Sequence, residues 1–422
     1  MSEVAQAPHS SPDGHIPQLR FPEFSGEWGR KLFNNIVDII DGDRGVNYPK
    51  SNDFFNDEYC LFLSAKNVTK NGFIFNETQF ITKERDALLR KGKLSRGDIV
   101  LTTRGTVGQF AFYSDDVLYD NIRINSGMVL LRNNNDNLLN SYFFKACKSF
   151  QISRQIKIVA FGSAQPQLTV KEINKIKISL PAKPEQQKIA AFLTAVDNKI
   201  EQLSKKQELL DEYKKGLMQQ IFSQAIRFKA DDGCDFPDWE EKSLGELFNY
   251  KNGGSFENEV VKDGLYNLIT LNSITIDGEL KNEHKKINSF DNSLKINDLI
   301  MVLSDVAHGN FLGLTAIIPE DNSYVLNQRM GALKSKGLNN VVFLRLLINY
   351  NQKYFKLHGQ GSSQQNLSKG DILKFELLLP NRNEQQKIAN FLSSIDTKIE
   401  QVGKQLRESK QFKKALLQQM FV

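Results

Sequence analysis

The 422-residue chain is long enough for two or three domains with substantial hydrophobic cores. Its composition of 40% hydrophobic and 25% charged residues is ordinary for a globular protein, and it contains neither a secretory signal pattern nor the run of about 18 apolar residues that a membrane span needs. The 55 basic and 49 acidic residues give a net charge of +6, which is compatible with a nucleic-acid ligand and equally with a solvated surface.

The three cysteines, Cys60, Cys147 and Cys234, are too far apart in the sequence to indicate a disulfide framework or a metal-binding pair. We therefore expect a cytoplasmic protein.

The first folded region is preceded by a short polar segment. Residues 1–20 are rich in Pro, Ser and Gly and have no apolar period, so we predict a flexible tail. The motif "FPEFSGEW" at Phe21 and its counterpart "FPDW" at Phe236 then mark the entry into two folded regions. We expect domains at 21–180 and 236–379.

Both regions read as short strands broken by Gly, Asn and Asp, with a few helical pieces, which is typical of an α+β domain. Their segments match in order: "YCLFLSAKNV" with "YNLITLNSIT", and "NIRINSGMVLL" with "LNQRMGALKS". Each region ends at a Pro that opens a long helical segment.

The helical segments, predicted at 181–224 and 380–422, are the clearest repeat. Pro181–Phe222 aligns with Pro380–Phe421 without a gap, and 21 of the 42 positions are identical. Apolar residues recur at alternating steps of four and three in both copies, and Lys214 and Lys413 interrupt this heptad seam at the same place.

Each helix must bury its seam, and the nearest partner is the other helix. The first helix leads through a linker at 225–235 into the second region, and the second helix follows that region. Paired seams therefore require antiparallel helices. We expect two globular domains separated by two long antiparallel coiled-coil helices, related by a pseudo-twofold internal repeat.

Sequence motifs for catalysis are missing. The chain has no P-loop, no His-Glu-x-x-His, no Gly-x-Ser-x-Gly elbow and no Asn/Asp-Pro-Pro-aromatic loop of an adenine methyltransferase. The sequence therefore predicts a binding protein rather than an enzyme.

Two copies of "EQQKIAxFLxxxDxKIEQ", each preceded by a "GSxQ" segment and by a region opened with "FP…W", resemble the specificity subunit of type I restriction–modification enzymes. The resemblance runs from about Phe21 to Val422. It implies two target-recognition domains that each read one half of a bipartite DNA sequence, while the helices set the spacing and dock two DNA adenine methyltransferase subunits. Motor-nuclease subunits would complete the complex, and S-adenosylmethionine, ATP and Mg would be bound by those partners, none by this chain.

DNA-reading side chains should be polar or basic and lie on loops of the two domains. Candidates in the first domain are Lys66, Asn67, Arg85, Arg90, Lys91, Lys93, Thr103, Arg104 and Thr106. Candidates in the second are Asn272, Ser273, Lys281, His284, Lys285, Lys286, Ser304, His308 and Asn310. Each of these could instead be a solvated surface or turn residue.

Identical residues partly off the heptad seam are candidates for partner binding. They are Glu185, Gln186, Gln187, Lys188 and Phe192, with their copies Glu384, Gln385, Gln386, Lys387 and Phe391. The alternative interpretation is that they cap the helix and pack on the adjoining domain.

Two other functions stay open from the sequence. One is a specificity subunit of a related restriction system, in which methylation and cleavage share one partner chain. The other is a coiled-coil adaptor whose domains bind proteins, which would show no salt-sensitive affinity for duplex DNA.

Overall fold

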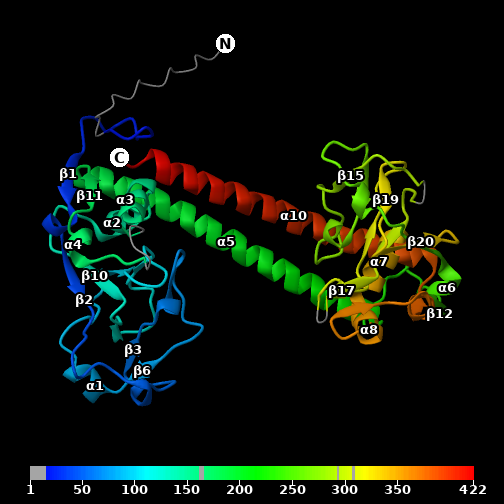
Figure 1. Cartoon of the computed structure of the whole chain (residues 1–422), viewed down its shortest axis with the longest axis horizontal. Helices are drawn as coiled ribbons and strands as arrows, with labels where there is room; N and C mark the ends of the chain where they lie inside the picture. The colour runs from blue at the N-terminus through cyan, green and yellow to red at the C-terminus, as the bar shows by residue number, and fades with distance from the viewer. Residues whose placement is uncertain (1–15, 161–165, 292–293, 307–308) are drawn as a thin grey trace, which may run out of the picture. The chain divides into compact units, whose positions relative to one another are not determined.

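The computed structural model describes residues 16–160, 166–291, 294–306 and 309–422, which form two compact units. Unit 1 comprises the chain up to Ser204 together with Lys404–Val422, and unit 2 comprises Lys205–Gly403. Each unit contains a head of short strands and helices, and also one part of each of two long helices (Figure 1).

The two long helices are α5 (Lys183–Phe222) and α10 (Arg382–Gln419), of 40 and 38 residues. At 1.5 Å per residue each is roughly 60 Å long. Each begins three residues after the end of the preceding strand and two residues after the proline of the repeat, as the Pro-initiated repeat predicts.

Within each unit the two helices run antiparallel. In unit 1, Leu193 shares a core with Leu416 and Met420, and in unit 2, Ile221 shares a core with Ile388 and Leu392. The lysines that interrupt the seam have acidic partners on the opposite helix. Lys413 Nζ lies 2.6 Å from Asp197 Oδ1, and Lys214 Nζ lies 2.5 Å from Asp396 Oδ1.

The head of unit 1 is built around a four-stranded antiparallel sheet in the order β2-β10-β7-β8, with a three-stranded sheet β6-β3-β9 beside it. Two-stranded pairs β1-β11 and β4-β5 complete it. The strands are β1 (Gly29–Leu32), β2 (Val37–Asp41), β3 (Cys60–Phe62), β4 (Val68–Thr69), β5 (Gly72–Phe73), β6 (Phe80–Ile81), β7 (Ile99–Thr102), β8 (Phe110–Phe112), β9 (Ile122–Arg123), β10 (Met128–Asn133) and β11 (Lys177–Leu180).

The head of unit 2 repeats this topology. The equivalent sheets are β13-β20-β16-β18, β15-β14-β19 and β12-β22, and β14-β19 is parallel just as β3-β9 is. The β4-β5 pair is reduced to the single bridge between Ile274 and Leu280, and the β17-β21 pair joins other segments. The strands are β12 (Glu240–Ser243), β13 (Phe248–Asn252), β14 (Tyr266–Ile269), β15 (Lys285–Ile287), β16 (Leu299–Val302), β17 (Ser304–Val306), β18 (Thr315–Ile317), β19 (Tyr324–Leu326), β20 (Met330–Ser335), β21 (Gln364–Asn366) and β22 (Glu376–Leu379). The segment pairs matched in the sequence occupy equivalent strands.

Short helices cover one face of each four-stranded sheet. In unit 1 the head helices are α1 (Lys83–Leu88), α2 (Asn140–Cys147), α3 (Phe150–Ala160) and α4 (Val170–Ile173). In unit 2 they are α6 (Leu244–Leu247), α7 (Val341–Tyr350), α8 (Gln352–His358) and α9 (Lys369–Leu373). Single 3-10 turns are η1 (Phe33–Asn35), η2 (Ser51–Asp53), η3 (Ala65–Asn67), η4 (Glu257–Glu259) and η5 (Leu271–Ser273).

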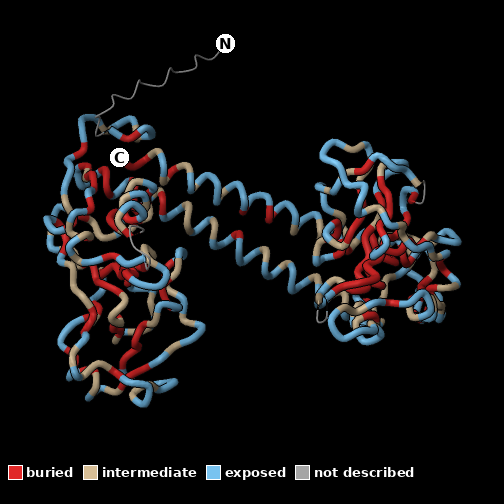
Figure 2. The backbone as a smooth tube through the Cα atoms, viewed as in Figure 1, coloured by how far each residue is buried: buried red, intermediate tan, exposed pale blue. Residues whose placement is uncertain are grey.

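The four-stranded sheet is the central layer of each head, because its two middle strands, β10 and β7 in unit 1 and β20 and β16 in unit 2, are buried on both faces (Figure 2). Along β10, Val129 and Leu131 face the core that holds the helices, while Met128 and Leu130 face the core beneath the three-stranded sheet. This alternation follows from the period of two in a strand. β16 alternates in the same way between the two cores of unit 2.

The expected α+β fold with a pseudo-twofold repeat and paired long helices is confirmed. In the part of the chain that the structure describes, no helix combines the length and apolarity that a membrane span requires.

Candidate nucleic-acid interface

Five of the nine candidates in unit 1 present exposed side chains: Lys66, Arg90, Lys91, Arg104 and Thr106. They come from the outer half of the head, around the three-stranded sheet, and from the loop after β7. Lys66 forms an exposed ion pair with Glu77, at 2.6 Å between Nζ and Oε2. A phosphate could replace such a partner at little cost, because exposed ion pairs contribute little stability.

The loop that follows β7 exposes an arginine on a fixed backbone. The backbone N–H groups of Thr103 and Arg104 both donate to Gly127 O, at 2.8 and 3.2 Å, and Gly105 takes a φ of +70°. The Arg104 side chain is exposed and has no hydrogen-bond or ion-pair partner among the described residues. A free guanidinium on a constrained turn suits either a guanine edge or a phosphate. Thr103 itself is buried.

Asn67 and Ser273, chosen as base readers, have buried side chains that fix local turns instead. Asn67 Oδ1 accepts from Ser64 N at 2.9 Å, and its Nδ2 donates to the carbonyls of Ile74 and Glu77. Ser273 Oγ accepts from Thr270 N at 3.0 Å. Because these polar atoms are already paired inside the head, they are not available to a base.

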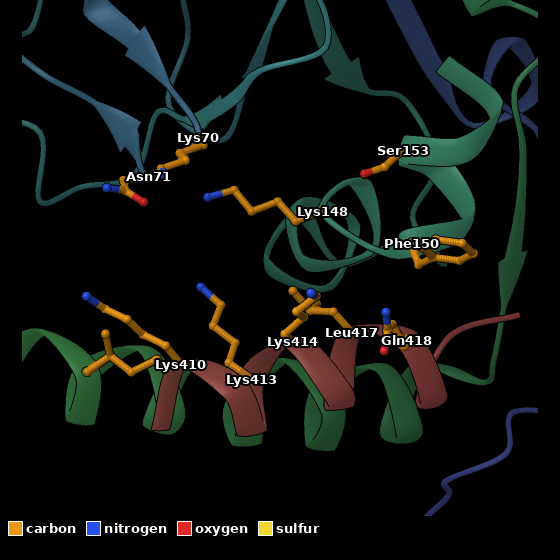
Figure 3. A pocket seen from close by; sticks show the side chains of 11 residues that line it. Lys70, Asn71, Lys148, Phe150, Ser153, Lys410, Lys413, Lys414, Leu417 and Gln418 are labelled. Atoms are coloured by element: carbon orange, nitrogen blue, oxygen red, sulfur yellow. The ribbon is translucent and has the colours of Figure 1, made fainter. Parts of the chain in front are cut away.

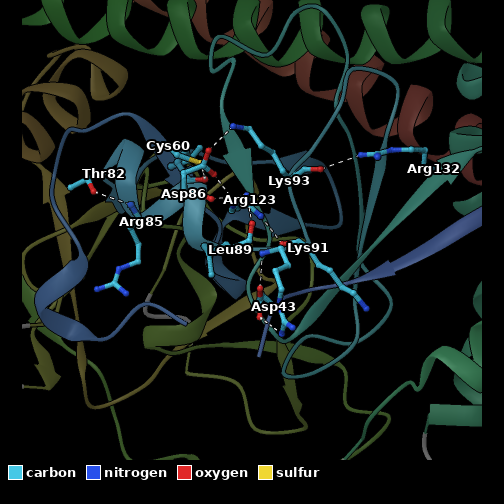
Figure 4. Close-up of polar contacts among 12 residues, drawn as sticks. Asp43, Cys60, Thr82, Arg85, Asp86, Leu89, Lys91, Lys93, Arg123 and Arg132 are labelled. Carbon is cyan, nitrogen blue, oxygen red and sulfur yellow. Dashed lines mark hydrogen bonds and ion pairs between the residues drawn. The ribbon is translucent and has the colours of Figure 1, made fainter. Parts of the chain in front are cut away.

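Two basic side chains of the outer layer belong to an ionic network around Asp86 (Figure 4). Arg123 and Lys93 both bond to the Asp86 carboxylate, and Arg123 also donates to the backbone carbonyls of Asp86, Leu89 and Lys91. Burial raises the pKa of Asp86, but the hydrogen bonds from Lys93 and Arg123 outweigh burial and hold it below the usual value.

The same network affects Cys60, whose pKa is raised to about 12 by burial and by the Asp86 charge. This thiol is therefore an unreactive core group. Arg85 is likewise committed, since its Nη2 lies 2.5 Å from Asp53 Oδ1. Lys93 and Arg85 are thus structural in this unit, while Arg90 and Lys91 project outward from the chain that crosses the network.

The candidates in unit 2 divide in the same way. Asn272, Lys281, Lys285 and Asn310 are exposed, His284 and Lys286 are half-buried, and Ser304 is buried. His308 lies outside the described residues. Lys285 pairs with Glu257 at 3.0 Å, and Asn310 Oδ1 accepts from Lys356 Nζ at 3.2 Å.

Ser304 lies in β17, which pairs with β21 of the "GSSQ" segment. The Gln364 amide donates to Ser304 Oγ. This hydrogen bond fixes the local backbone rather than reading a base. His284 stacks edge-on against Tyr324, and burial lowers its pKa, so the imidazole is neutral near pH 7.

Two of the identical helix residues of unit 1 are buried against the head. Arg20 donates to both carboxylate oxygens of Glu185, at 2.7 and 2.8 Å. Gln186 Nε2 donates to Pro181 O and Asn137 O, and its Oε1 accepts from Leu139 N, all at 2.9 Å. The start of α5 is therefore clamped to the head by groups that water cannot reach.

Unit 2 repeats this clamp with different chain segments. Arg227 donates to Glu384 at 3.2 and 2.8 Å, and Trp239 Nε1 donates to the same carboxylate at 3.1 Å. Gln385 Nε2 donates to Pro380 O at 2.8 Å, and its Oε1 accepts from Asn340 N at 2.9 Å.

The alternative interpretation, that the repeated residues cap the helix and pack on the head, describes Glu185, Gln186, Glu384 and Gln385. Their polar atoms are already bonded within their own unit, so a partner cannot reach them. Phe192 and Phe391 are half-buried and covered by aromatic rings of their own units: Phe21 at 5.7 Å and Phe228 at 5.5 Å between ring centroids.

The four remaining candidates stay nearer the surface. Gln187, Lys188 and Gln386 are exposed, and Lys387 is half-buried. Lys188 pairs with Glu23, and Lys387 pairs with Asp231 at 2.6 Å.

Sequence reasoning missed Arg20 and Arg227. Arg20 falls in the predicted tail and Arg227 in the predicted linker, and they are not aligned in the repeat. Their common signal is weak: an arginine shortly before each "FP" motif. Residues 1–15 of the predicted tail lie outside the described residues, whereas Leu19 N donates to Gln419 O at 3.0 Å.

The described residues hold no group of three or more His, Cys, Asp or Glu side chains placed to bind a metal ion. What both heads share is a repeated frame of equivalent sheets and helix clamps, on which exposed polar and basic side chains stand at different positions.

Comparison with known proteins agrees with this frame. Residues 32–211 and 237–408 match the family model described as the type I restriction modification DNA specificity domain. The chain is 26% identical over 361 residues to the MjaVIII type I restriction enzyme specificity subunit of Methanocaldococcus jannaschii, covering 80% of this chain and 79% of that protein. The putative MjaX specificity subunit of the same organism is 25% identical over 370 residues, covering 84% and 83%.

Solved structures share the fold. The S subunit of a type I restriction-modification system from M. genitalium matches with a TM-score of 0.60 at 16% identity, over 96% of this chain and 99% of that one. A chain from a study of assembly and conformational transition of the type I R-M system matches with a TM-score of 0.57 at 16% identity, over 97% and 98%. Each region matched by the family model spans one head and most of the long helix that follows it. The chain therefore belongs to the family of type I restriction–modification DNA specificity proteins.

Proposed function

We propose that this chain is the DNA-reading subunit of a type I restriction–modification complex. Each head reads one half of a bipartite DNA target, and the long helices set the number of unspecified base pairs between the halves. The chain itself carries out no catalysis.

One observation carries this proposal. The two heads have the same sheet order and the same helix clamp, yet their outer layers differ. An exposed arginine, Arg104, stands on the loop after β7, whereas the corresponding segment after β16 has Asp305, whose side chain is buried. A repeated frame with divergent surfaces fits the recognition of two different half-sites. Phosphate contacts position such domains and base contacts specify the sequence.

The partners are two copies of a DNA adenine methyltransferase subunit, joined by motor-nuclease subunits in the restriction complex. One partner type bound twice needs one surface presented twice. Exposed identities on the long helices supply such a surface: Gln187, Lys199, Glu201 and Gln202, with their copies Gln386, Lys398, Glu400 and Gln401. S-adenosylmethionine, ATP and Mg belong to those partner subunits.

A map of modified bases tests the proposal. Genomic DNA is compared between cells with this gene and cells that lack it but keep the methyltransferase. We expect adenine methylation at one split motif to disappear when the gene is absent. A matched strain expressing the chain with Arg104→Ala controls for expression, and its residual map shows whether the first half-site is relaxed.

An unchanged map in the deletion strain would contradict the proposal. Salt-independent affinity of the purified complex for duplex DNA would favour the protein-binding adaptor instead, because phosphate contacts impose a steep loss of affinity with salt.

A further inference from the structure

Unit 1 contains a groove lined by lysines that no functional assignment above uses. It has a volume of about 480 Å³ and lies between the β4-β5 turn, the α2–α3 corner and the C-terminal part of α10. That volume is many times the roughly 30 Å³ that one water molecule occupies. Its basic lining residues are Lys70, Lys148, Lys410, Lys413 and Lys414.

The lysines come from three separate segments and face a common space. Figure 3 shows the side chains of Lys148, Lys410 and Lys413 extending into the opening between α10 and the turn that carries Lys70 and Asn71. Within the described part of the chain, only Lys413 of these five forms an ion pair, with Asp197. Four ammonium groups thus remain uncompensated around one groove.

Crowding of positive charge is strongest at Lys148. Burial and the nearby charge of Lys413 lower its pKa to about 8, although Asp197 acts in the opposite direction. Its ammonium group also lies 4.3 Å from the centroid of the Phe144 ring. A bound anion would relieve this repulsion.

The repeat provides an internal comparison. In the helix alignment Lys410 corresponds to Asp211. The turn closed by Asn67 N and Ser64 O is equivalent to the turn closed by Ser273 N and Thr270 O, so Lys70 and Asn71 correspond to Ile276 and Asp277. In unit 2 burial and the charge of Asp277 raise the pKa of Asp211, so two carboxylates lie close together where unit 1 has Lys410 and Asn71. Lys413 and Lys414 have lysines as their counterparts, Lys214 and Lys215, so the corresponding surface of unit 2 combines two lysines with two carboxylates.

Lys148 also has an uncharged counterpart. Leu139 and Asn340 donate their backbone N–H groups to the equivalent glutamines, Gln186 and Gln385, which aligns Lys148 with Asn349. Asn349 is occupied by hydrogen bonds to Thr315. The excess of positive charge is thus a property of one repeat only.

We infer that this lysine groove binds the phosphate backbone of duplex DNA next to the half-site that unit 1 reads, and that the equivalent surface of unit 2 does not. The inference rests on the proposed function. It adds an anchor on one half of the target that is independent of sequence, because lysine supplies point charges without the bidentate geometry that reads a base.

The one-sided placement favours DNA over an acidic protein segment. A methyltransferase bound twice needs the same surface in both units, whereas in the second unit two carboxylates balance the two lysines that remain. A bipartite DNA target has two different halves, so one-sided backbone contacts suit it. The two carboxylates of unit 2 would offset the attraction of its two lysines for phosphate.

The experiment uses the complete complex of this chain with its methyltransferase subunits. One variant carries Lys410→Ala and Lys414→Ala, and a second carries Lys70→Ile and Asn71→Asp, which installs the residues of the other repeat. Lys404→Ala, an exposed lysine of α10 outside the groove, is the matched control. Affinity is measured over a series of salt concentrations for duplexes with and without the methylated motif.

We expect the α10 variant to reduce the slope of log affinity against log salt by about 1.8, at about 0.9 for each phosphate that a lysine no longer neutralises. The turn variant should reduce it by about half as much, since it removes one lysine. Both reductions should be the same for the two duplexes, the methylated motif should stay unchanged, and the control should retain the original slope.

Unchanged slopes in both variants would overturn the inference. A loss of complex assembly at constant slope would also overturn it and would identify an acidic protein segment as the occupant of the groove. A loss of affinity confined to the duplex with the motif would overturn it as well, because that result would indicate base reading. Failure of the proposed function is a separate result, in which the wild-type complex methylates no split motif. In that case the slope of log affinity against log salt on DNA without the motif still tests the groove.

Discussion

At the scale of single residues, Glu185 and Glu384 show how a repeated side chain can be structural rather than exposed. Each is buried, with 2% and 0% of its side chain accessible, and each is compensated by an arginine of its own unit. A buried carboxylate left without its partner is strongly unfavourable, whereas the intact pair is close to neutral in free energy. The arginines therefore matter more for retaining the clamp than for adding stability.

Replacement of Arg20 by Met should loosen the start of α5. We expect Arg20→Met to cost about 3 kcal/mol of local stability, since it leaves Glu185 buried and uncompensated. Hydrogen exchange of peptides from α5, followed by mass spectrometry, measures this as reduced protection. Arg227→Met should cost less, because Trp239 still donates to Glu384.

Lys66→Met is the control for charge removal alone, since the Lys66–Glu77 pair is exposed, and it should leave the protection of α5 unchanged. Equal protection in Arg20→Met and wild type would show that the clamp does not hold the helix.

Residue type alone could not separate readers from structural groups. Asn67 and Asn272 are both amides in matching turns, but the Asn67 side chain points inward to close the turn and Asn272 is exposed. Asn272 stands one position earlier in its turn than Asn67 does, and this shift of one residue decides which side chain faces solvent. A short turn has no periodic pattern from which such a shift could be predicted. The ion pairs of Arg85 and Lys93 depend on how short loops fold back on one another, and they are invisible for the same reason.

At the scale of elements, the structure explains why a lysine interrupts the heptad seam of each long helix: the lysine has an acidic partner on the other helix. Asp197 accepts a hydrogen bond from Lys145 of α2 and forms an ion pair with Lys413 of α10, each at 2.6 Å. Its counterpart Asp396 has Lys214 at 2.5 Å. Burial raises the pKa of Asp197, but the hydrogen bonds from Lys145 and Lys413 outweigh it and hold the pKa below its usual value of 3.8.

Asp197→Asn should destabilise the helix pair of unit 1 by about 1–3 kcal/mol near pH 7, less than a fully buried pair because 29% of the carboxylate side chain is accessible. A depressed pKa contributes stability that is complete above the unfolded value and disappears as pH falls through the folded value. The difference between wild type and variant should therefore shrink below about pH 4.

Hydrogen exchange of peptides at 189–203 and 406–420, measured over a pH series, checks this expectation. Asp396→Asn is the matched variant in unit 2 and should have the smaller effect, since one lysine rather than two is left without its partner. A difference that persists unchanged at pH 3 would contradict the ionic account.

The long helices were predictable because their period repeats over many turns. Leu193, Leu203, Leu392 and Leu406, all on the predicted seam, are buried. The strands of the heads are only two to six residues long, so the sequence indicated their existence and correspondence better than their pairing. The parallel pairs β3-β9 and β14-β19 join segments about 60 residues apart and had no local signal.

At the scale of the whole molecule, the repeat applies one frame to two reading tasks. The four-stranded and three-stranded sheets of both heads have the same strand order, yet one groove carries five lysines where its counterpart has two lysines and two carboxylates. Selection for two different half-sites would retain the frame and allow the surfaces to diverge.

Exchange of residues 21–180 for the corresponding head of another specificity protein should alter one half of the methylated motif and leave the other half unchanged. The reason is that each head has its own cores and its own helix clamp. Sequencing of modified bases gives the result directly. A chimera that changes both halves would show that the heads do not read independently.

The arginine clamps bear on how such genes reassort. Besides its glutamate, Arg20 donates to the backbone carbonyls of Ser25 and Gly26, and Arg227 donates to those of Phe236 and Pro237. Arg227 also pairs with Asp238 at 3.6 Å, but that carboxylate is fully exposed and contributes little. Because the anchor holds the entry of each head mainly through backbone atoms, it depends little on the identity of the residues there. A recombination event with its crossover points between the arginine and the glutamate of a clamp would exchange the whole head and leave both clamp residues in place. The new head would bring a new DNA specificity and would be anchored to the long helix from the start.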